Sequence, residues 1–303
     1  MQKIIHSLAI PSLFPKTQES WDAFERMVHF LAKNEFRYDQ LEFYHPPGHD
    51  RDIRRLFESA GFSSILIAVF ALKGANLSLC SLDGEERRQA VDLLKSCMDR
   101  AAETGSHSVM VNSGFIPAYS PAAKAAFPSR EQIRSSCDAY VRSIEEAAEY
   151  GEKHGNAISL LLEPGDSKVQ SFQLLGPTEL VVETAKQIKA PLYALTMDVA
   201  HIREEGEDVM SSLRQTLPWC SHIHLCNCVM DDPTNPLYGD KHVDFDCPGA
   251  CWNYGDFENM YKDIKDLYKE RDFTVTLEIT CRAENNEAWF DGVASRCAWL
   301  FRD

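Results

Sequence analysis

Eight short apolar runs alternate with amphipathic helical stretches along the whole chain, and this alternation limits the folds that are open to it. The runs that we interpret as strands cover residues 4–10, 40–44, 64–70, 109–111, 157–163, 193–199, 221–227 and 273–279. Between them, apolar residues recur with helical spacing, for example at Trp21, Phe24, Val28 and Leu31. Strands that alternate with helices predict a parallel sheet that is covered by helices.

Two α/β architectures fit this order: a closed (β/α)₈ barrel and an open, doubly wound sheet. The open sheet usually carries a glycine-rich phosphate loop after its first strand, whereas residues 9–14 contain no glycine. Eight strand–helix pairs in 303 residues, with no linker between them, match a (β/α)₈ TIM barrel. We therefore predict a single TIM-barrel domain over residues 1–303, with a long functional loop at about 229–254 after the seventh strand.

Charge and composition narrow the class of partner. A formal net charge of -15 repels polyanions, so we expect neither nucleic acid nor an anionic membrane surface as a partner. We find no transmembrane run and no apolar signal segment at the N-terminus. The ten cysteines lack zinc-ribbon spacing. We expect a cytoplasmic protein with free thiols, and a pairing of Cys247 with Cys251 in their shared loop is a weaker alternative.

Four of the predicted strands carry, at or near their ends, a side chain that can bind a metal ion. Glu163, Asp198 and Glu278 close the fifth, sixth and eighth strands, and His224 lies at the matching depth of the seventh. A buried carboxylate is costly unless something compensates its charge. Because the C-terminal ends of barrel strands converge on one face, these side chains would line a common arc. Two Glu, one Asp and one His form a ligand set for one divalent cation.

This pattern resembles the xylose isomerase-like TIM-barrel superfamily of sugar isomerases and epimerases, and its second half is the specific part. The motif includes the Asp198-x-x-His201 element of the sixth strand. The resemblance implies one divalent ion, most often Mn²⁺ but with Co²⁺, Mg²⁺ or Zn²⁺ also suitable, held by Glu163, Asp198, His224 and Glu278. It also implies that His201 contacts substrate. In the tagatose/psicose 3-epimerase branch, which is closest in pattern, Glu163 and Glu278 would be the catalytic acid–base groups.

The expected activity is therefore that of a metal-dependent isomerase or epimerase that acts on a small ketose or a related carbonyl compound. A metal ion that chelates the carbonyl and the neighbouring hydroxyl acidifies the adjacent C–H by stabilising an enediolate, and a carboxylate removes the proton. Two bases on opposite faces of the carbon would epimerise it, whereas one base would interconvert aldose and ketose. The sequence leaves this choice open, together with the sugar and the oligomeric state.

Further residues are candidates for substrate binding. Asp240 and His242 lie in the loop after the seventh strand, and Arg282 follows the eighth strand. Asn112 and Glu42 stand at the ends of the fourth and second strands. We expect all five to contact hydroxyl groups of a sugar or polyol-derived substrate, with specificity set by the loops at 115–128 and 229–254.

Three other functions are alternatives to an isomerase or epimerase. A keto-inositol dehydratase would use the same metal and base but expel a β-hydroxyl group. The element Asp240-x-His242 resembles, more distantly, that of the apurinic-site endonucleases, which hold three zinc ions. Those enzymes also need histidines after the third and fourth strands, and residues 69–73 and 111–114 contain none. The last alternative is a carbohydrate-binding or metal-sensing barrel without catalytic activity.

Overall fold

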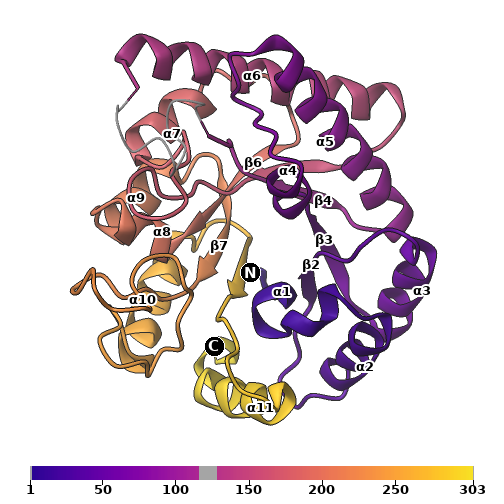
Figure 1. Cartoon of the computed structure of the whole chain (residues 1–303). Coiled ribbons are helices and arrows are strands. Elements are labelled where there is room, and N and C mark those ends of the chain that lie inside the picture. The colour runs from indigo at the N-terminus through magenta and orange to yellow at the C-terminus, as the bar shows by residue number, and fades with distance from the viewer. Residues whose placement is uncertain (1, 116–127, 303) are drawn as a thin grey trace.

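Eight parallel strands close into a barrel in chain order, as predicted (Figure 1). The structure, a computed structural model, describes residues 2–115 and 128–302, so most of the expected specificity loop at 115–128 lies outside the described residues. The strands are β1 Ile4–Ala9, β2 Gln40–Phe43, β3 Ser63–Ile67, β4 Ser108–Val111, β5 Ser159–Leu162, β6 Tyr193–Asp198, β7 Cys220–Leu225 and β8 Phe273–Leu277.

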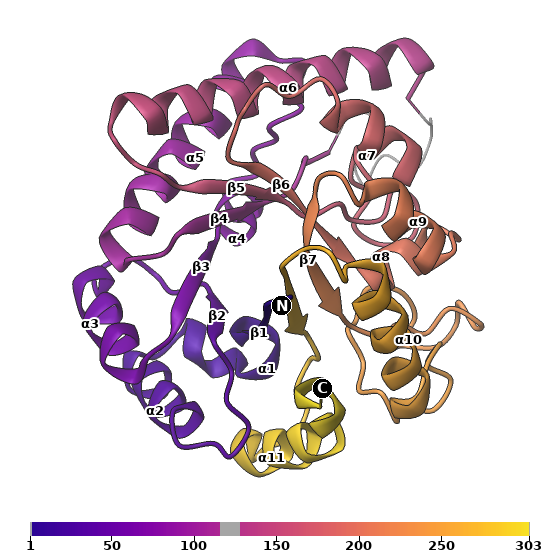
Figure 2. The same cartoon turned by 180° about the vertical axis from the view of Figure 1, so that it is seen from behind.

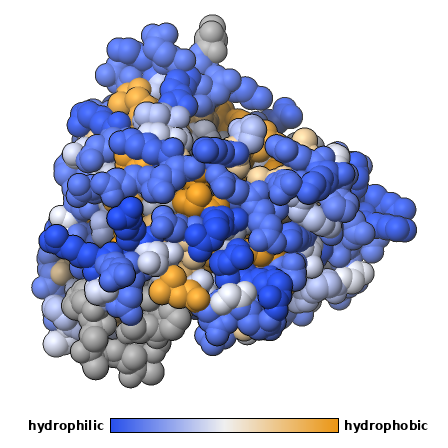
Figure 3. Space-filling model, turned by 90° about the horizontal axis from the view of Figure 1, so that it is seen from above, coloured by the Kyte–Doolittle hydropathy of each residue, from blue (hydrophilic) through white to orange (hydrophobic). Residues whose placement is uncertain are grey.

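Helices surround the barrel between consecutive strands, and the main hydrophobic core lies between the two layers (Figure 2). They are α1 Ile10–Leu13, α2 Trp21–Leu31, α3 Asp50–Ala60, α4 Val69–Gly74, α5 Gly84–Thr104, α6 Arg130–Lys153, α7 Thr178–Ala185, α8 Val199–Glu204, α9 Val209–Thr216, α10 Tyr254–Leu267 and α11 Asn286–Arg296. Within residues 2–115 and 128–302, no helix is long and apolar enough to span a membrane. The face in Figure 3 is mostly hydrophilic, with hydrophobic residues in small separate groups.

The long helices begin where their capping residues predict. Asp83 accepts hydrogen bonds from the backbone N–H groups of Glu85 and Glu86 at the start of α5. Ser129 and Gln132 form a reciprocal capping box at the start of α6. Such caps satisfy backbone donors that have no partner inside the helix. The two helices therefore start at residues that their caps define.

The interior of the barrel is apolar on one side and polar on the other. Every second residue of a barrel strand points inward. Ile65, Met110 and Leu161 from β3, β4 and β5 form a small apolar cluster of their own. Opposite them, β7 and β8 contribute His222, His224 and Thr276, and these three meet Glu42 of β2, as described below. The polar half lies under the strand ends that carry the predicted metal ligands.

Three predicted strands are shorter than expected because short helices follow them at once. The apolar runs predicted as strands to residues 10, 70 and 199 end at Ala9, Ile67 and Asp198, and α1, α4 and α8 begin directly beyond or one residue later. Periodicity cannot separate a buried strand from a short buried helix inside one continuous apolar run. The helix α8 matters for function, because its N-cap is Asp198.

A capping box also fixes the start of α10. Asn253 is the N-cap and Asp256 is the third helical residue. The Asn253 side chain accepts hydrogen bonds from Gly255 N and Asp256 N, and Asp256 Oδ2 accepts one from Asn253 N in return. Asparagine is among the preferred N-cap residues, and the short aspartate takes the position that glutamate or glutamine usually holds.

Candidate metal and substrate site

The four predicted metal ligands converge at the C-terminal end of the barrel. Glu163, Asp198, His224 and Glu278 each offer a ligand atom, and these four atoms lie within 4.8 Å of one another. His224 Nδ1 lies 2.9 Å from Glu163 Oε1 and 2.8 Å from Glu278 Oε2. Neighbouring strands β5 to β8 supply the four groups, as the closed strand order requires. The side chains of Asp198 and His224 are almost fully buried, whereas both glutamates keep some exposure.

Asp198 uses its two carboxylate oxygens differently. Oδ1 accepts hydrogen bonds from Ala200 N at 2.7 Å and His201 N at 3.0 Å, which caps α8. The Cys226 thiol donates a further hydrogen bond to Oδ1 at 2.6 Å. Oδ2 is buried and has no hydrogen-bond partner among the described residues. The capping contacts therefore fix the carboxylate and leave its second oxygen facing the cluster.

Glu42 lies below His224 and does not reach the open end of the barrel. Its Oε2 is 3.1 Å from His224 Nε2, and its Oε1 is 2.8 Å from His222 Nε2. Thr276 Oγ1 and Ser7 Oγ also donate hydrogen bonds to Oε1. Glu42 has no exposed surface, so its side chain is not placed to contact a substrate as we expected. It contacts His224 instead and can orient the imidazole ring. A carboxylate on the far nitrogen of a metal-binding histidine fixes the ring and increases its basicity.

The donor set fits a divalent cation. Three buried atoms of the cluster, Asp198 Oδ2, His224 Nδ1 and Glu278 Oε2, have no well-aligned hydrogen-bond partner among the residues the structure describes. Buried polar atoms are normally paired, so unpaired ones call for an explanation. Three carboxylates around one imidazole also bring together negative charge that a cation would neutralise. The set of oxygens with one nitrogen suits Mn²⁺ and similar ions.

A second group of side chains, His201, Asp240 and His242, adjoins the first. Asp240 Oδ1 lies 2.9 Å from His242 Nε2 and 3.6 Å from His201 Nε2. His242 Nδ1 lies 3.2 Å from Glu278 Oε1, which links the two groups. His201 Nδ1 pairs with the Pro164 carbonyl at 2.9 Å, so its Nε2 is turned toward Asp240. The three ligand atoms of this group also lie within 4.8 Å of one another.

Neighbouring segments hold Asp240 and His242 in place. Gln170, in the connection between β5 and α7, donates from Nε2 to the Asp240 carbonyl at 2.9 Å. The Thr280 N–H donates to the His242 carbonyl at 2.7 Å. His242 has a φ of 43°, in the left-handed region, and non-glycine residues keep such a conformation only where the surroundings determine it. The connection between β7 and α10 therefore presents these two side chains in a defined orientation.

Two other predicted substrate ligands have different environments. Arg282 is exposed, and its guanidinium donates to the carbonyls of Thr280 and Lys241, so it supports the backbone beside Asp240 and His242. Asn112 is buried directly after β4, beside the start of the segment that carries Glu163. Arg282 is thus placed to position other residues, and Asn112 remains a candidate for direct contact.

Several residues at the site were not predicted. Ser12 Oγ donates to Glu278 Oε1 at 3.0 Å, and the Cys226 and His222 side chains contact Asp198 and Glu42. The alternation of inward-facing residues along the seventh strand could have found His222, two residues before His224. Ser12 could not have been found in this way, because it comes from the short helix α1 that the sequence did not reveal.

The buried charges influence one another strongly. Burial alone would raise the pKa of Glu278, but His242 and His224 hold it well below its usual value. Burial alone would lower the pKa of His224, but Glu42 and Glu163 raise it well above its usual value. The carboxyl group of Glu204 in α8 differs from that of Glu278, because burial raises the pKa of Glu204 to about 9. Neither of its carboxylate oxygens has a hydrogen-bond partner in the described part of the chain.

The family model of the xylose isomerase-like TIM barrel matches residues 21–300. The chain belongs to this family. Members named among the structural matches include sugar epimerases, a dehydratase and an endonuclease, so this is a fold family of enzymes. A comparison with curated proteins finds no match.

Three solved structures illustrate the range of this fold family. A D-tagatose 3-epimerase-like protein superposes with a TM-score of 0.69 at 16% identity, covering 98% of this chain and 100% of that one. A probable 3-DHS dehydratase from Bacillus anthracis gives 0.65 at 17% identity, covering 100% and 99%. An AP endonuclease of family 2 from Brucella melitensis gives 0.66 at 16% identity, covering 96% and 99%. At these identities the likeness concerns the fold alone.

Proposed function

We propose that the protein is a divalent-metal-dependent isomerase or epimerase of a small ketose or a related carbonyl compound. The observation that carries this proposal is the convergence of Glu163, Asp198, His224 and Glu278 within 4.8 Å at the ends of four neighbouring strands. We propose one ion at this site, with Mn²⁺ as the first candidate and Co²⁺, Mg²⁺ or Zn²⁺ as alternatives. A bound cation would stabilise negative charge that develops on substrate oxygens.

The two glutamates are the proposed acid–base groups. Removal of a proton from the carbon next to a carbonyl needs a positioned base, and return of a proton needs an acid. Glu163 and Glu278 are partly exposed and approach His224 Nδ1 from the ends of two different strands, β5 and β8, so each is a candidate to face a substrate carbon. Ser12 and His242 contact Glu278 Oε1 and thereby orient that carboxylate. Action of both groups on opposite faces gives an epimerase, and action of one gives an isomerase.

His201, Asp240 and His242 are the proposed contacts to substrate hydroxyl groups. They adjoin Glu278 and offer both donors and acceptors, which is what several hydroxyl groups require. Asn112 is a further candidate contact, and Arg282 supports the backbone between Asp240 and His242. The partner that fits these groups is a small sugar or polyol-derived molecule, and the net charge of -15 disfavours nucleic acid.

A dehydratase of a keto-inositol or a similar compound is the second candidate. It rests on the same base beside the same cation site, and a structural neighbour is described as a dehydratase. Nuclease activity is less favoured, because residues 69–73 and 111–114 lack histidine. We propose the cytoplasm as the location, since all ten cysteines, each within the described residues, are free thiols.

Exchange of substrate hydrogen with D₂O tests the proposal without knowledge of the product. The protein loaded with Mn²⁺ is incubated with a panel of unphosphorylated and phosphorylated ketoses, and deuterium in the sugar is followed by NMR. We expect incorporation next to the carbonyl of at least one ketose, and the spectrum of the product then separates epimer, aldose and dehydrated compound. Absence of exchange across the panel by metal-loaded protein would argue against carbon deprotonation.

The glutamine variants separate the roles of the two glutamates. Glu163→Gln and Glu278→Gln keep side-chain size but remove the proton acceptor, so we expect turnover to fall by about 10²–10⁴-fold in each variant of a two-base epimerase. One variant of such an enzyme should still exchange hydrogen with D₂O, because the remaining base removes and returns the proton on one face. Near-normal turnover in both variants would indicate that Glu163 and Glu278 have only a structural role.

A further inference from the structure

Two thiols face each other where the connection between β7 and α10 begins and ends. Cys228 Sγ and Cys251 Sγ lie 3.8 Å apart, with Cys228 as the donor. The Cys251 N–H donates to the Cys228 carbonyl at 2.9 Å, and the adjacent pair Val229 and Ala250 forms an antiparallel bridge. From this geometry we propose that Cys228 and Cys251 are a peroxide-reactive dithiol that forms a reversible disulfide.

The antiparallel pairing at the two cysteines predicts a backbone spacing that a disulfide can span. Residues directly opposite in an antiparallel pair, joined by a backbone hydrogen bond, have Cα atoms about 5.5 Å apart. Disulfides span Cα separations of about 4.4–6.8 Å. Asn227 fixes both sides, because its side chain bonds the Trp252 carbonyl and the N–H groups of Cys228 and Trp252. Bond formation therefore needs the two sulfurs to approach each other, with little movement of the backbone.

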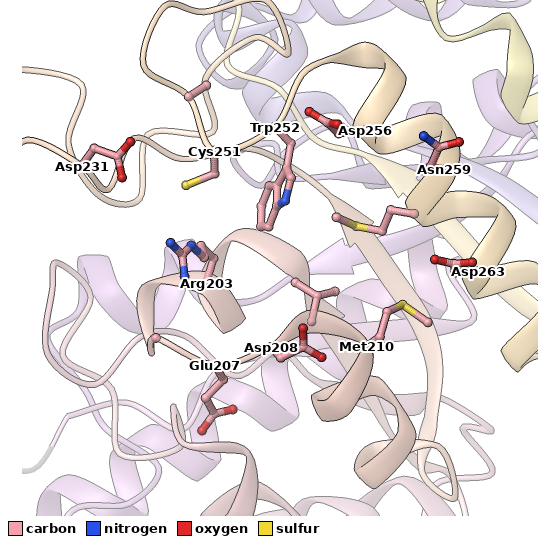
Figure 4. Close-up of a pocket in the computed structure, with 14 residues that line it drawn as sticks. Arg203, Glu207, Asp208, Met210, Asp231, Cys251, Trp252, Asp256, Asn259 and Asp263 are labelled. Atoms are coloured by element: carbon pink, nitrogen blue, oxygen red, sulfur yellow. The ribbon is translucent and has the colours of Figure 1, made fainter.

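The two thiols differ in access and in reactivity. Cys228 is fully buried, whereas Cys251 is half-buried and lines a pocket of about 720 Å³ (Figure 4). Arg203 extends toward Cys251 in the same pocket. The hydrogen bond from Cys228 lowers the pKa of Cys251 below that of an ordinary thiol, and Arg203 acts in the same direction against the effect of burial. The thiolate is the nucleophile, so Cys251 is the attacking group and Cys228 the resolving one.

The oxidation balances with a hydroperoxide as the oxidant. The Cys251 thiolate attacks one oxygen of hydrogen peroxide, the O–O bond breaks, and a sulfenic acid and hydroxide form. The sulfur of Cys228 then attacks the Cys251 sulfur, its proton passes to the departing hydroxyl group, and the S–S bond forms as water leaves. Two thiols lose two electrons in all, and the peroxide is reduced to two molecules of water. A dithiol reductant reverses the process by exchange.

The bridge would tie together the two ends of the segment that carries Asp240 and His242. Residues 229–250 would become a covalently closed loop, which lowers the freedom of its opened states. Among the described residues, the sulfur of Cys247 contacts the Pro248 carbonyl, whereas Cys251 faces Cys228. The proposed partner of Cys251 is therefore Cys228 and not Cys247, the weaker alternative that the sequence offered. This inference does not depend on the proposed enzymatic function.

Mass spectrometry of the native protein tests the inference. The full chain is treated with a small excess of hydrogen peroxide, remaining thiols are alkylated, and proteolytic peptides are analysed with and without dithiothreitol. We expect a peptide pair that links Cys228 to Cys251, a mass loss of two hydrogens, and reversal by dithiothreitol. Hydrogen exchange of residues 229–250 should slow in the oxidised protein. A different disulfide, or no disulfide while Cys251 is oxidised, would overturn the inference.

Three variants assign the roles of the thiols. Cys228→Ser should let a Cys251 sulfenic acid accumulate and be trapped by dimedone, whereas Cys251→Ser should give neither an adduct nor a disulfide at this place. Cys247→Ser is the matched control and should behave as the wild type. Under native conditions at neutral pH, iodoacetamide should label Cys251 at least roughly tenfold faster than Cys247 in the wild type. Equal labelling rates, or trapping of Cys247 in the Cys228→Ser variant, would contradict the assignment.

Discussion

At the residue scale, the site depends on a charged group that the substrate would not touch. Glu42 is fully buried and contacts His222, His224, Thr276 and Ser7 from below. Burial alone would raise the pKa of this carboxyl group, but the two histidines lower it below its usual range. An ionised Glu42 therefore holds the His224 ring with Nδ1 toward Glu163 and Glu278.

Removal of this charge should weaken metal binding without unfolding the barrel. In Glu42→Gln an amide replaces the carboxylate against two histidine nitrogens, so we predict an affinity for Mn²⁺ lower by about 10–100-fold, the usual effect of losing such an outer contact. Isothermal titration calorimetry of metal-free protein with Mn²⁺ measures this affinity. Ser7→Ala is the control. It removes a long hydrogen bond of 3.3 Å to the same carboxylate and another of 3.3 Å from Gln40 Nε2 but leaves the charge of Glu42 in place, so it should bind Mn²⁺ nearly as the wild type does. Equal affinities in all three proteins would refute the role of Glu42.

A second prediction at this scale concerns pH. Burial raises the pKa of Glu204 to about 9 from its usual 4.5, so the folded protein keeps this proton while the unfolded chain releases it. Between these two values a rise in pH therefore favours unfolding. The variant Glu204→Gln removes the effect, and its stability relative to the wild type should increase by about 1–3 kcal/mol between pH 5 and pH 8. Urea unfolding at the two pH values measures this difference.

The exposed Glu103 of α5 provides the matched control for Glu204. Glu103→Gln should change stability little and by a similar amount at both pH values, because substitutions at exposed positions have small effects. A Glu204→Gln difference that does not grow with pH would show that Glu204 is ionised in the folded protein.

The cluster of candidate metal ligands could be predicted from single residues, and the residues that support it could not. Glu163, Asp198 and Glu278 each follow an apolar run, so the cost of burying an isolated carboxylate indicated a common partner. Glu42 was recognised as a candidate but assigned to substrate, because its contacts depend on the register between distant strands. Cys226 contacts Asp198 across two neighbouring strands, and nothing in the local sequence distinguishes it from an apolar core residue.

At the scale of elements, the connection between β5 and α7 is organised by one aspartate. Asp166 is fully buried and accepts hydrogen bonds from the backbone N–H groups of Lys168 and Gln170, among others, and from the Ser171 hydroxyl group. Gln170 in turn holds the Asp240 carbonyl. The connection thus joins the fifth strand to the loop after the seventh.

Truncation of Asp166 should therefore affect both stability and the site. We predict that Asp166→Ala lowers the free energy of unfolding by at least about 2 kcal/mol, because several backbone donors lose a charged acceptor. Asp232→Ala is the matched control, since Asp232 is exposed and accepts from Thr234 in a similar local turn. That variant should lose much less stability than Asp166→Ala, because the Asp232 side chain lies in solvent. Urea denaturation of both variants measures their free energies of unfolding, and equal losses of stability would contradict this prediction.

Long elements were predictable and short ones were not. The helices α5 and α6 have capping residues and an apolar stripe over many turns, and they begin where these signals predict. The helices α1, α4 and α8 have only four to six residues and continue an apolar strand. A helix this short completes little more than one turn, which is too short to show a repeating apolar stripe, and tertiary packing rather than local preference stabilises it.

At the scale of the whole molecule, the proposed ion would join β5, β6, β7 and β8 at one point. Because an ion that binds only the folded chain stabilises it by mass action, a concentration of 100 times Kd adds about 2.7 kcal/mol. We predict that a chelator lowers the melting temperature of metal-loaded protein by roughly 4 °C. Restored Mn²⁺ should reverse the change, and His224→Ala should not respond. Calorimetry with and without the chelator measures the shift, and identical melting temperatures in the wild type would contradict it.

Metal analysis of purified variants tests most directly whether these four strand ends form one ion site. After loading with Mn²⁺ and gel filtration, atomic emission should find one ion per chain in the wild type and in His201→Ala, and almost none in Asp198→Asn. Two ions per chain in the wild type would show that a second group of side chains, for which His201, Asp240 and His242 are one candidate, also binds a cation. Full occupancy in Asp198→Asn, or an empty wild-type protein after loading, would contradict the assignment of Glu163, Asp198, His224 and Glu278 as the ligands.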